Sequence, residues 1–279
     1  MESSQNALQC GDKTLDLSRP KIMGILNVTP DSFSDGGRFL GLDKALEHAE
    51  SMLAAGADIL DVGGESTRPG AADVSVQQEL DRILPVIEAI NTRFDTIISL
   101  DTSKSAVIQE GAGAGARLIN DVRALREPDA LETAVKTGLP VCLMHMQGQP
   151  RSMQQAPEYS DVLAEVTQFL MDRRQVCIDA GIPASQIVID PGFGFGKNLE
   201  HNLTLLQGLE TLCDNAPVLI GLSRKRMFAN ILNNDSVSRV VASVTAALLC
   251  VQRGASIVRV HDVEETAHAL AVYRAVDEL

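Results

Sequence analysis

The chain of 279 residues is predicted to be a single (β/α)8 barrel, a TIM barrel with its active site at the carboxyl ends of the strands. Two observations predict this fold. Short apolar or β-branched runs alternate along the chain with longer segments whose apolar residues recur every three or four positions. Polar side chains follow every run, which an open doubly wound sheet would not require. No Pro/Ser linker or shift in composition divides the chain, so residues 1–279 are expected to form one domain.

The eight predicted strands occur at regular intervals. In chain order they are "IMGILNV" from residue 22, "ADILDVG" from 57, "TIISLD" from 96, "RLINDV" from 117, "PVCLMHM" from 140, "IVIDPG" from 187, "PVLIGLS" from 217 and "SIVRVHD" from 256. One helix is predicted after each strand, for example over 42–57 and 74–90. Several helices are predicted to end at a glycine just before the next strand: Gly56, Gly115, Gly138, Gly181 and Gly254.

Composition and charge limit the classes of partner. The net charge of −13 argues against nucleic acid or an anionic membrane surface as the main partner, because both would be repelled. Five scattered cysteines without a C-x-x-C pair argue against disulfides and zinc. The first residues lack the pattern of a signal peptide, and the longest apolar run, 240–251, is too short to cross a bilayer. We therefore expect a cytoplasmic protein.

Each predicted strand ends in a side chain that forms hydrogen bonds or carries charge. In order, these ends are Asn27, Asp61, Asp101, Asn120-Asp121, His145, Asp190, Ser223-Arg224-Lys225 and Arg259-Val260-His261. Because the carboxyl ends of parallel barrel strands share one face, we expect these side chains to converge there. Polar turns explain one or two such ends, but not eight, so a functional site is predicted at this face.

Two glycine-rich segments also leave strands, "DVGGESTRPGA" and "DPGFGFGK". Glycine lets a backbone approach a ligand closely, although a tight turn would explain either segment alone. "DPGFGFGK" lacks the spacing of a G-x-x-x-x-G-K-[ST] phosphate loop, and no G-x-G-x-x-G follows the first strand. Nucleotide binding is therefore not predicted.

One group of strand-end residues offers mostly hydrogen-bond acceptors. Asp101, Asn120 and Asp190 belong to it, and Met144 lies on an adjacent strand. Buried carboxylates need donors, and a heterocycle with several N–H groups would supply them. A structural pairing of Asp190 with Lys225 is the alternative reading of that carboxylate.

A second group offers donors. Arg68, Arg259 and His261 can donate hydrogen bonds and, together with Asn27, would suit a phosphate group. His261 stands two positions after Arg259 on a strand, so both side chains point the same way and can bind one anion.

Four of the seven phenylalanines fall in turn-like stretches, where an apolar ring needs a cover. Phe39 and Phe193 are expected to cap the core. For Phe33 and Phe195, which polar residues and glycines surround, a flat organic ligand is an equal alternative to core packing.

Eight motifs, in this order, now indicate a family. They are "GILNVTPDSFSDGG", "DVGGESTRPGA", "DTSK", "INDV", "MHMQGQP", "DPGFGFGK", "GLSRKR" and "RVHD", and they span residues 21–263. Together they resemble the bacterial dihydropteroate synthases, transferases of folate biosynthesis that sulfonamides target. The resemblance implies a barrel that condenses (7,8-dihydropterin-6-yl)methyl diphosphate with p-aminobenzoate and releases diphosphate.

The resemblance also implies a role for each matching residue. Asp101, Asn120, Asp190 and Lys225 would hold the pterin ring, and Met144 and Phe195 would line its pocket. Thr67, Arg68, Arg259 and His261 would bind diphosphate, and Asn27 would ligate Mg²⁺. Phe33, Thr67, Pro69, Gly221 and Ser223 would contact the substrates around p-aminobenzoate. Asp101, Lys225 and Arg259 would act in catalysis, and a homodimer is expected from the family.

Two other functions remain as alternatives. A methyltetrahydrofolate-dependent methyltransferase domain would share the barrel and the pterin contacts, but it needs no diphosphate site such as Arg68, Arg259 and His261 would form. A non-catalytic paralogue would bind pterin or act as a partner subunit, and it would be expected to lose some of those residues. All are present. No role is predicted for the segment 147–160.

Overall fold

The computed structural model describes residues 7–28, 37–66, 73–148, 157–234 and 236–277. All eight predicted strands are present and parallel: β3 (Lys21–Asn27), β4 (Ile59–Gly63), β5 (Ile97–Asp101), β6 (Leu118–Asp121), β7 (Val141–Met144), β8 (Ile187–Asp190), β9 (Leu219–Ile220) and β10 (Ile257–Val260). Their spatial order is β8-β7-β6-β5-β4-β3-β10-β9. The edges meet where Ile189 N donates to Pro217 O at 3.0 Å. The sheet is thereby closed, and the predicted (β/α)8 barrel is confirmed.

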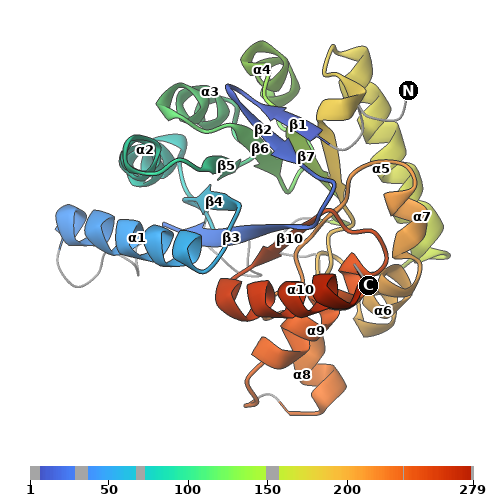
Figure 1. Cartoon of the computed structure of the whole chain (residues 1–279). Helices are drawn as coiled ribbons and strands as arrows, with labels where there is room; N and C mark the ends of the chain where they lie inside the picture. Colours follow the sequence, from blue (N-terminus) through green and yellow to red (C-terminus); the bar gives the residue numbers. More distant parts are fainter. Residues whose placement is uncertain (1–6, 29–36, 67–72, 149–156, 235, 278–279) are drawn as a thin grey trace.

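Helices cover the outside of the barrel (Figure 1). They are α1 (Gly37–Ala54), α2 (Val76–Arg93), α3 (Ser105–Ala114), α4 (Ala130–Thr137), α5 (Val162–Asp179), α6 (Leu199–Gln207), α7 (Leu209–Cys213), α8 (Arg226–Leu232), α9 (Val240–Val251) and α10 (Val263–Asp277). Within the described ranges, none of them is long and apolar enough to span a membrane.

The connections after β8 and β9 differ from the predicted single helices. Each contains two helices, because the chain leaves helical geometry at Gly208 and adopts a left-handed conformation at Asn233, with φ of 49°. The five glycines predicted to end helices all have positive φ, from 66° at Gly138 to 127° at Gly115. Glycine adopts this conformation without a Cβ clash, so the predicted helix ends are confirmed.

Helix α2 illustrates how local sequence sets an element. Ser75 and Gln78 form a capping box, in which each side chain accepts a hydrogen bond from the other residue's backbone N–H. Ile83, Ile87 and Ile90 then fall on one face at helical spacing and are buried against the barrel.

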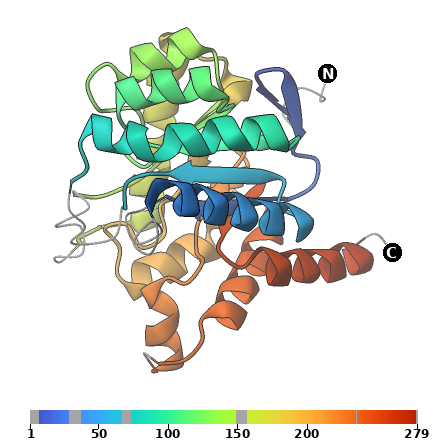
Figure 2. The same ribbon diagram turned by 90° about the vertical axis from the view of Figure 1, so that its left-hand side faces the viewer.

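An N-terminal hairpin, which the sequence analysis did not predict, closes the amino end of the barrel. Strands β1 (Ala7–Cys10) and β2 (Lys13–Asp16) pair antiparallel, and the hairpin lies at one end of the barrel (Figure 2). Its apolar residues pack on one residue from each of the eight barrel strands: Met23, Ile59, Ile97, Leu118, Cys142, Val188, Leu219 and Ile257. The amino end is therefore filled by side chains, and the opposite end is left as the mouth.

The interior of the barrel changes from apolar to polar toward the mouth. Alternate residues of a strand point to the same face, so two steps from this apolar layer lead along the inner wall. The residues reached are Ile25, Asp61, Ser99, Asn120, Met144, Asp190, Gly221 and Arg259. The inner wall at the mouth is thus lined mainly by polar residues, while the outward positions pack against helices.

Candidate active site at the barrel mouth

A guanidinium between two carboxylates forms the centre of the mouth. Arg259 Nε donates to Asp61 Oδ2 and Arg259 Nη2 donates to Asp101 Oδ2, both at 2.6 Å. The Asp61 side chain is fully buried, and those of Asp101 and Arg259 are 10% and 22% exposed. The sequence pattern places Asp101 among the acceptors and Arg259 among the phosphate donors. The structure joins the two groups through this bridge.

Asp61 had been given no role beyond its place at a strand end. Besides Arg259, it accepts hydrogen bonds from Ser99 Oγ at 2.6 Å and from Asn120 Nδ2 at 3.2 Å. Asp61 stands two residues before Gly63, the last residue of β4, so both point to the same face of the strand. This two-residue period is the signal that could have placed Asp61 on the inner wall. Asp61 therefore orients both Arg259 and Asn120.

Burial and neighbouring charges perturb the pKa values at this centre. Burial, opposed by the attraction of Arg259 and reinforced by the Asp61 carboxylate, raises the pKa of Asp101 to about 7. Burial alone would lower the pKa of Arg259, but the carboxylates of Asp61 and Asp101 outweigh it and hold the pKa above its usual value. Arg259 consequently stays charged, whereas Asp101 is poised to gain or lose a proton near neutral pH.

A second part of the mouth combines a carboxylate, an ammonium and an apolar wall. Lys225 Nζ lies 4.1 Å from the centroid of the Phe195 ring, so the lysine forms a cation–π contact. Phe195 packs against the cluster formed by Met144 and Met146. Burial raises the pKa of Asp190, while the Gly192 amide and Lys225 oppose the shift. Burial likewise lowers the pKa of Lys225 to about 8, with Asp190 opposing it.

The two phenylalanines of "DPGFGFGK" lie in different surroundings. Phe193 is buried in the main core, which confirms the predicted capping role. Phe195 instead lies at the mouth. Phe33 and the side chain of Phe39 lie outside the described residues.

Where the mouth is formed by the ends of β9 and β10, Ser223 and His261 lie together. Ser223 Oγ accepts a hydrogen bond from His261 N at 3.1 Å and lies 3.0 Å from His261 Nδ1. Gly221 directly follows β9 and is partly exposed. Two residues predicted for different substrates, the phosphate donor His261 and the p-aminobenzoate contact Ser223, are therefore neighbours.

Three further predicted site residues, Thr67, Arg68 and Pro69, lie outside the described residues. The chain that leads to them is anchored, however. Lys104 Nζ contacts Glu65 Oε2 at 2.6 Å and also the carboxylate of Glu79, which is fully buried. Glu65 belongs to the motif "DVGGESTRPGA" and Lys104 to the motif "DTSK". The sequence pattern assigns neither residue a role.

Asn27 occupies the edge of the mouth at the end of β3. It is exposed and level with Gly63, which is in turn level with Asp101. Among the described residues, no group of three or more His, Cys, Asp and Glu side chains is placed to hold a metal. Mg²⁺ commonly takes one or two protein oxygens and completes its shell with phosphate and water. An exposed amide oxygen beside the mouth fits that mode.

The predicted convergence of all strand-end polar residues is wrong for Asp121 and His145. Both occupy the outward positions of their strands. Asp121 accepts hydrogen bonds from the backbone N–H groups of Arg123 and Leu125, each at 2.7 Å. The His145 ring packs edge-on against Phe169 of α5, with centroids 4.9 Å apart. The two-residue period of a strand excludes them from the mouth although they stand beside residues that face it.

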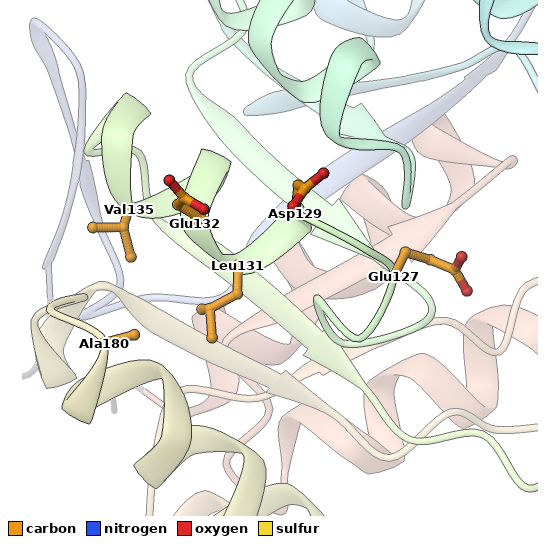
Figure 3. Close-up of a pocket in the computed structure, with 6 residues that line it drawn as sticks. All are labelled: Glu127, Asp129, Leu131, Glu132, Val135 and Ala180. Atoms are coloured by element: carbon orange, nitrogen blue, oxygen red, sulfur yellow. The ribbon is translucent and has the colours of Figure 1, made fainter.

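A hollow of about 420 Å³ lies on the outside of the barrel, away from this mouth (Figure 3). Its lining comprises Glu127, Asp129, Leu131, Glu132, Val135 and Ala180. Glu127 pairs with Arg123 at 3.0 Å and Glu132 with Lys136 at 2.7 Å. With two of its carboxylates already paired, the hollow is a weaker candidate site than the mouth.

Comparison with known proteins agrees with this placement. Residues 23–261 match the family model described as pterin binding enzyme. The chain is 55% identical to the dihydropteroate synthase of Escherichia coli K12, over 94% of this chain and 93% of that one. It also resembles the structure of Yersinia pestis dihydropteroate synthase in a sulfonamide drug complex, with a TM-score of 0.92, 55% identity and coverage of 98% and 100%.

The Xanthomonas albilineans dihydropteroate synthase, solved with 4-aminobenzoic acid, has a TM-score of 0.92 to this chain. The two are 47% identical, and the match covers 99% of each chain. These similarities extend over the whole barrel and include the strand ends that form the mouth. The chain therefore belongs to the dihydropteroate synthase family of pterin-binding enzymes.

Proposed function

We propose that the chain condenses (7,8-dihydropterin-6-yl)methyl diphosphate with p-aminobenzoate and releases 7,8-dihydropteroate and diphosphate. The observation that carries this proposal is the inner wall of the mouth, where three carboxylates, an amide, a lysine and an arginine converge. A planar heterocycle with an anionic leaving group needs this combination of acceptors and donors. The relatives at 55% identity bear the same function in their names.

In this proposal the dihydropterin ring lies between the carboxylates and the apolar wall. Its amino-amide edge donates two parallel hydrogen bonds to Asp190, whose orientation is set by the Gly192 amide at 2.7 Å. Asn120 and Asp101 contact other polar atoms of the ring. Lys225 donates to a ring acceptor, and Phe195 packs with Met144 as the apolar surface.

The diphosphate binds on the side of Arg259 and His261. A guanidinium has five N–H donors, and its contacts with Asp61 and Asp101 use only two. Thr67 and Arg68 complete this subsite. Mg²⁺ held by Asn27 supplies further neutralisation of the phosphate oxygens when bound. Because the leaving group gains negative charge as its bond breaks, these cations favour the transition state over the ground state.

Bond breaking precedes bond making in this mechanism. The methylene C–O bond breaks with its electron pair on diphosphate, which leaves positive charge delocalised into the pterin. Ionised Asp101 stabilises that charge. The neutral amine of p-aminobenzoate, held by Ser223, Gly221, Pro69, Thr67 and Phe33, then forms the C–N bond and loses a proton to water. No strong base is needed, since the aromatic amine is already neutral.

The test is to measure diphosphate release from the pterin substrate with and without p-aminobenzoate, in Mg²⁺ or in EDTA. Release that needs Mg²⁺, rises with p-aminobenzoate and yields dihydropteroate supports the whole proposal. A sulfonamide should raise the KM for p-aminobenzoate without lowering kcat, because it competes for the same subsite. A folded protein that binds pterin and releases no diphosphate would contradict the reaction and favour the methyltransferase or the non-catalytic paralogue.

We also propose that two copies associate through α9 and α10. These helices pack on one another, and Val241 and Val272 are 77% and 67% exposed. Large exposed apolar side chains on adjacent helices favour a covered interface. Light scattering should give twice the mass of the chain, and Val241→Asp should give a monomer.

The remaining expectations fit the same picture. We place the protein in the cytoplasm as a single domain, with small molecules rather than nucleic acid as its substrates. All five cysteines are free thiols, as a reducing compartment favours. The hairpin packs on every strand of the barrel, which favours one folding unit.

A further inference from the structure

Lys197, the last residue of "DPGFGFGK", is buried beside the mouth. Within the described part of the chain, its ammonium forms no hydrogen bond with a side chain of the inner wall. Only 2% of Lys197 is exposed. Its Nζ donates to the carbonyl oxygens of Gly192 and Phe195, both at 3.0 Å, and lies 2.9 Å from His145 Nδ1. An ammonium in such a site is costly unless it is fully hydrogen-bonded, so these acceptors stabilise it.

The partner His145 is suited to accept. Burial, reinforced by the charge of Lys197, lowers the pKa of His145 to about 3, so the imidazole is neutral. A neutral imidazole protonated on Nε2 presents Nδ1 as an acceptor. Burial also lowers the pKa of Lys197, to about 7, while Asp190 opposes the shift. Lys197 and His145 are the two titratable residues of their motifs that the proposed reaction does not use.

The loop that Lys197 contacts is packed tightly on both sides. A Cβ on Gly192, where φ is +66°, would lie 1.9 Å from the His145 carbonyl oxygen. A Cβ on Gly194 would lie 3.1 Å from Lys225 Cδ. The loop 192–196 therefore lies between the end of β7 and Lys225, and a shift of its backbone would move the Phe195 ring relative to Lys225.

Two other side chains hold the same loop. Asp190 Oδ1 accepts from Gly192 N and Asn202 Oδ1 accepts from Gly194 N, each at 2.7 Å. Asn202 Nδ2 also donates to Lys197 O at 3.3 Å. Asp190 and Asn202 bind N–H groups of the loop, whereas Lys197 binds its carbonyl groups. These contacts are complementary, and without the ammonium the carbonyl groups of Gly192 and Phe195 would lose a side-chain donor.

We propose that Lys197 is a positioning residue for the dihydropterin subsite: from the outer side of the barrel, its ammonium fixes the 192–196 loop and thereby sets the Phe195 ring and the Asp190 carboxylate against the ligand. This inference rests on the proposed function. It assigns Lys197 no contact with substrate, and it predicts a selective effect on the pterin half of the reaction.

The experiment compares Lys197→Met, which keeps the length of the side chain but not its donors, with the wild-type enzyme. The KM for the pterin diphosphate should rise by about tenfold to a hundredfold, since small displacements of positioning groups have effects of this size. The KM for p-aminobenzoate should change by less than about threefold, because the Lys197 ammonium bonds to Gly192, Phe195 and His145 and not to Gly221 or Ser223, the described residues expected around p-aminobenzoate. Lys197→Gln, whose side-chain amide keeps two N–H donors, should recover part of the loss.

Lys21→Met is the matched control. Lys21 is a partly buried lysine at the amino end of β3, and its Nζ lies 3.6 Å from Asp58 Oδ1. Lys21→Met therefore removes the same charge at the opposite end of the barrel. It should leave both KM values unchanged. A merely structural role for Lys197 would lower the melting temperature and the amount of active protein, with both KM values as in wild type. That result in a folded Lys197→Met or Lys197→Gln variant would overturn the proposal.

Calorimetry with 6-hydroxymethylpterin separates this inference from the proposed reaction. If wild-type protein forms no dihydropteroate but binds this pterin, and Lys197→Met binds it at least tenfold more weakly, the reaction is wrong and the positioning role stands. Equal affinity of the two proteins overturns the positioning role.

Discussion

Lys225 and Lys197 contact the same glycine-rich loop, but one faces the barrel mouth and the other faces the helical layer. Lys225 lies over the Phe195 ring, whereas Lys197 binds the backbone carbonyl groups of Gly192 and Phe195. Burial lowers the pKa of both ammonium groups, to about 8 and about 7 respectively. A lowered pKa therefore accompanies two different tasks: contact with a ligand on the inner wall and support of that wall from outside.

The same division separates neighbouring residues on single strands. Asn120 points inward and donates to Asp61, while Asp121, the next residue, holds backbone amides of the loop that follows β6. Met144 faces the mouth and His145 faces α5. The lesson is that the strand position, more than the residue type, decides which polar groups of this barrel reach a ligand.

The largest effect is expected for Arg259→Ala on the inner wall. The variant loses its contacts with the departing diphosphate and leaves Asp61 and Asp101 without the cation between them. We expect kcat to fall by about a hundredfold to a thousandfold, the range seen when one charge-stabilising donor is removed. Steady-state kinetics with both substrates would show it. Arg259→Lys should recover only part of the rate, because an ammonium lacks the planar fork; an unchanged kcat in Arg259→Ala would refute the assignment.

The next largest effect is expected in the pH dependence of kcat/KM, through the charge of Lys225. A lysine is charged below its pKa, and burial lowers the pKa of Lys225 to about 8. The value of kcat/KM for the pterin diphosphate should therefore decline as the pH rises, first near 7 as Lys197 loses its charge and again near 8 as Lys225 does. Lys225→Arg keeps its charge at these pH values, so the part of the decline near pH 8 should move to higher pH. If the profile of Lys225→Arg matches that of wild type, another group controls the limb.

Asp61→Asn should have a smaller effect than either change. The amide keeps the shape of the side chain, but it removes the charge that orients Arg259 Nε. We expect kcat/KM for the pterin diphosphate to fall by about tenfold, as for the loss of one charged hydrogen bond. Ser99→Ala, which removes only the neutral donor to Asp61, is the control and should cost less. Equal losses in the two variants would argue against an orienting role for the Asp61 charge.

The smallest effect on activity is expected at the floor of the barrel. Leu8 of the hairpin has no exposed surface, so Leu8→Ala should lower the free energy of unfolding by about 2–5 kcal/mol. The kcat of the folded variant at low temperature should stay near that of wild type. Leu203→Ala, at a leucine of α6 that is 44% exposed, should change stability by about 0.5 kcal/mol or less. Denaturant unfolding measures both, and a loss of kcat in folded Leu8→Ala would contradict a purely structural floor.

The sequence alone determined the barrel and much of its mouth. Its eight apolar runs, helix-ending glycines and polar strand ends are local signals, because backbone conformation and the two-residue period of a strand depend on neighbouring residues. The family resemblance added the substrates. Asp101, Asn120, Asp190, Lys225 and Arg259 were all expected at the mouth, and all are found there.

Only the tertiary structure decided how those groups pair. The hairpin β1–β2 is recognisable as a floor only when the eight strands it covers are already a closed ring. Arg259 meets Asp61 and Asp101 across 198 and 158 positions of sequence, and Lys197 meets His145 across 52. No local pattern encodes such contacts, since they depend on the order and closure of the strands. That is the physical reason the residues of the site could be named from sequence, while the bridge at its centre and the lysine behind it could not.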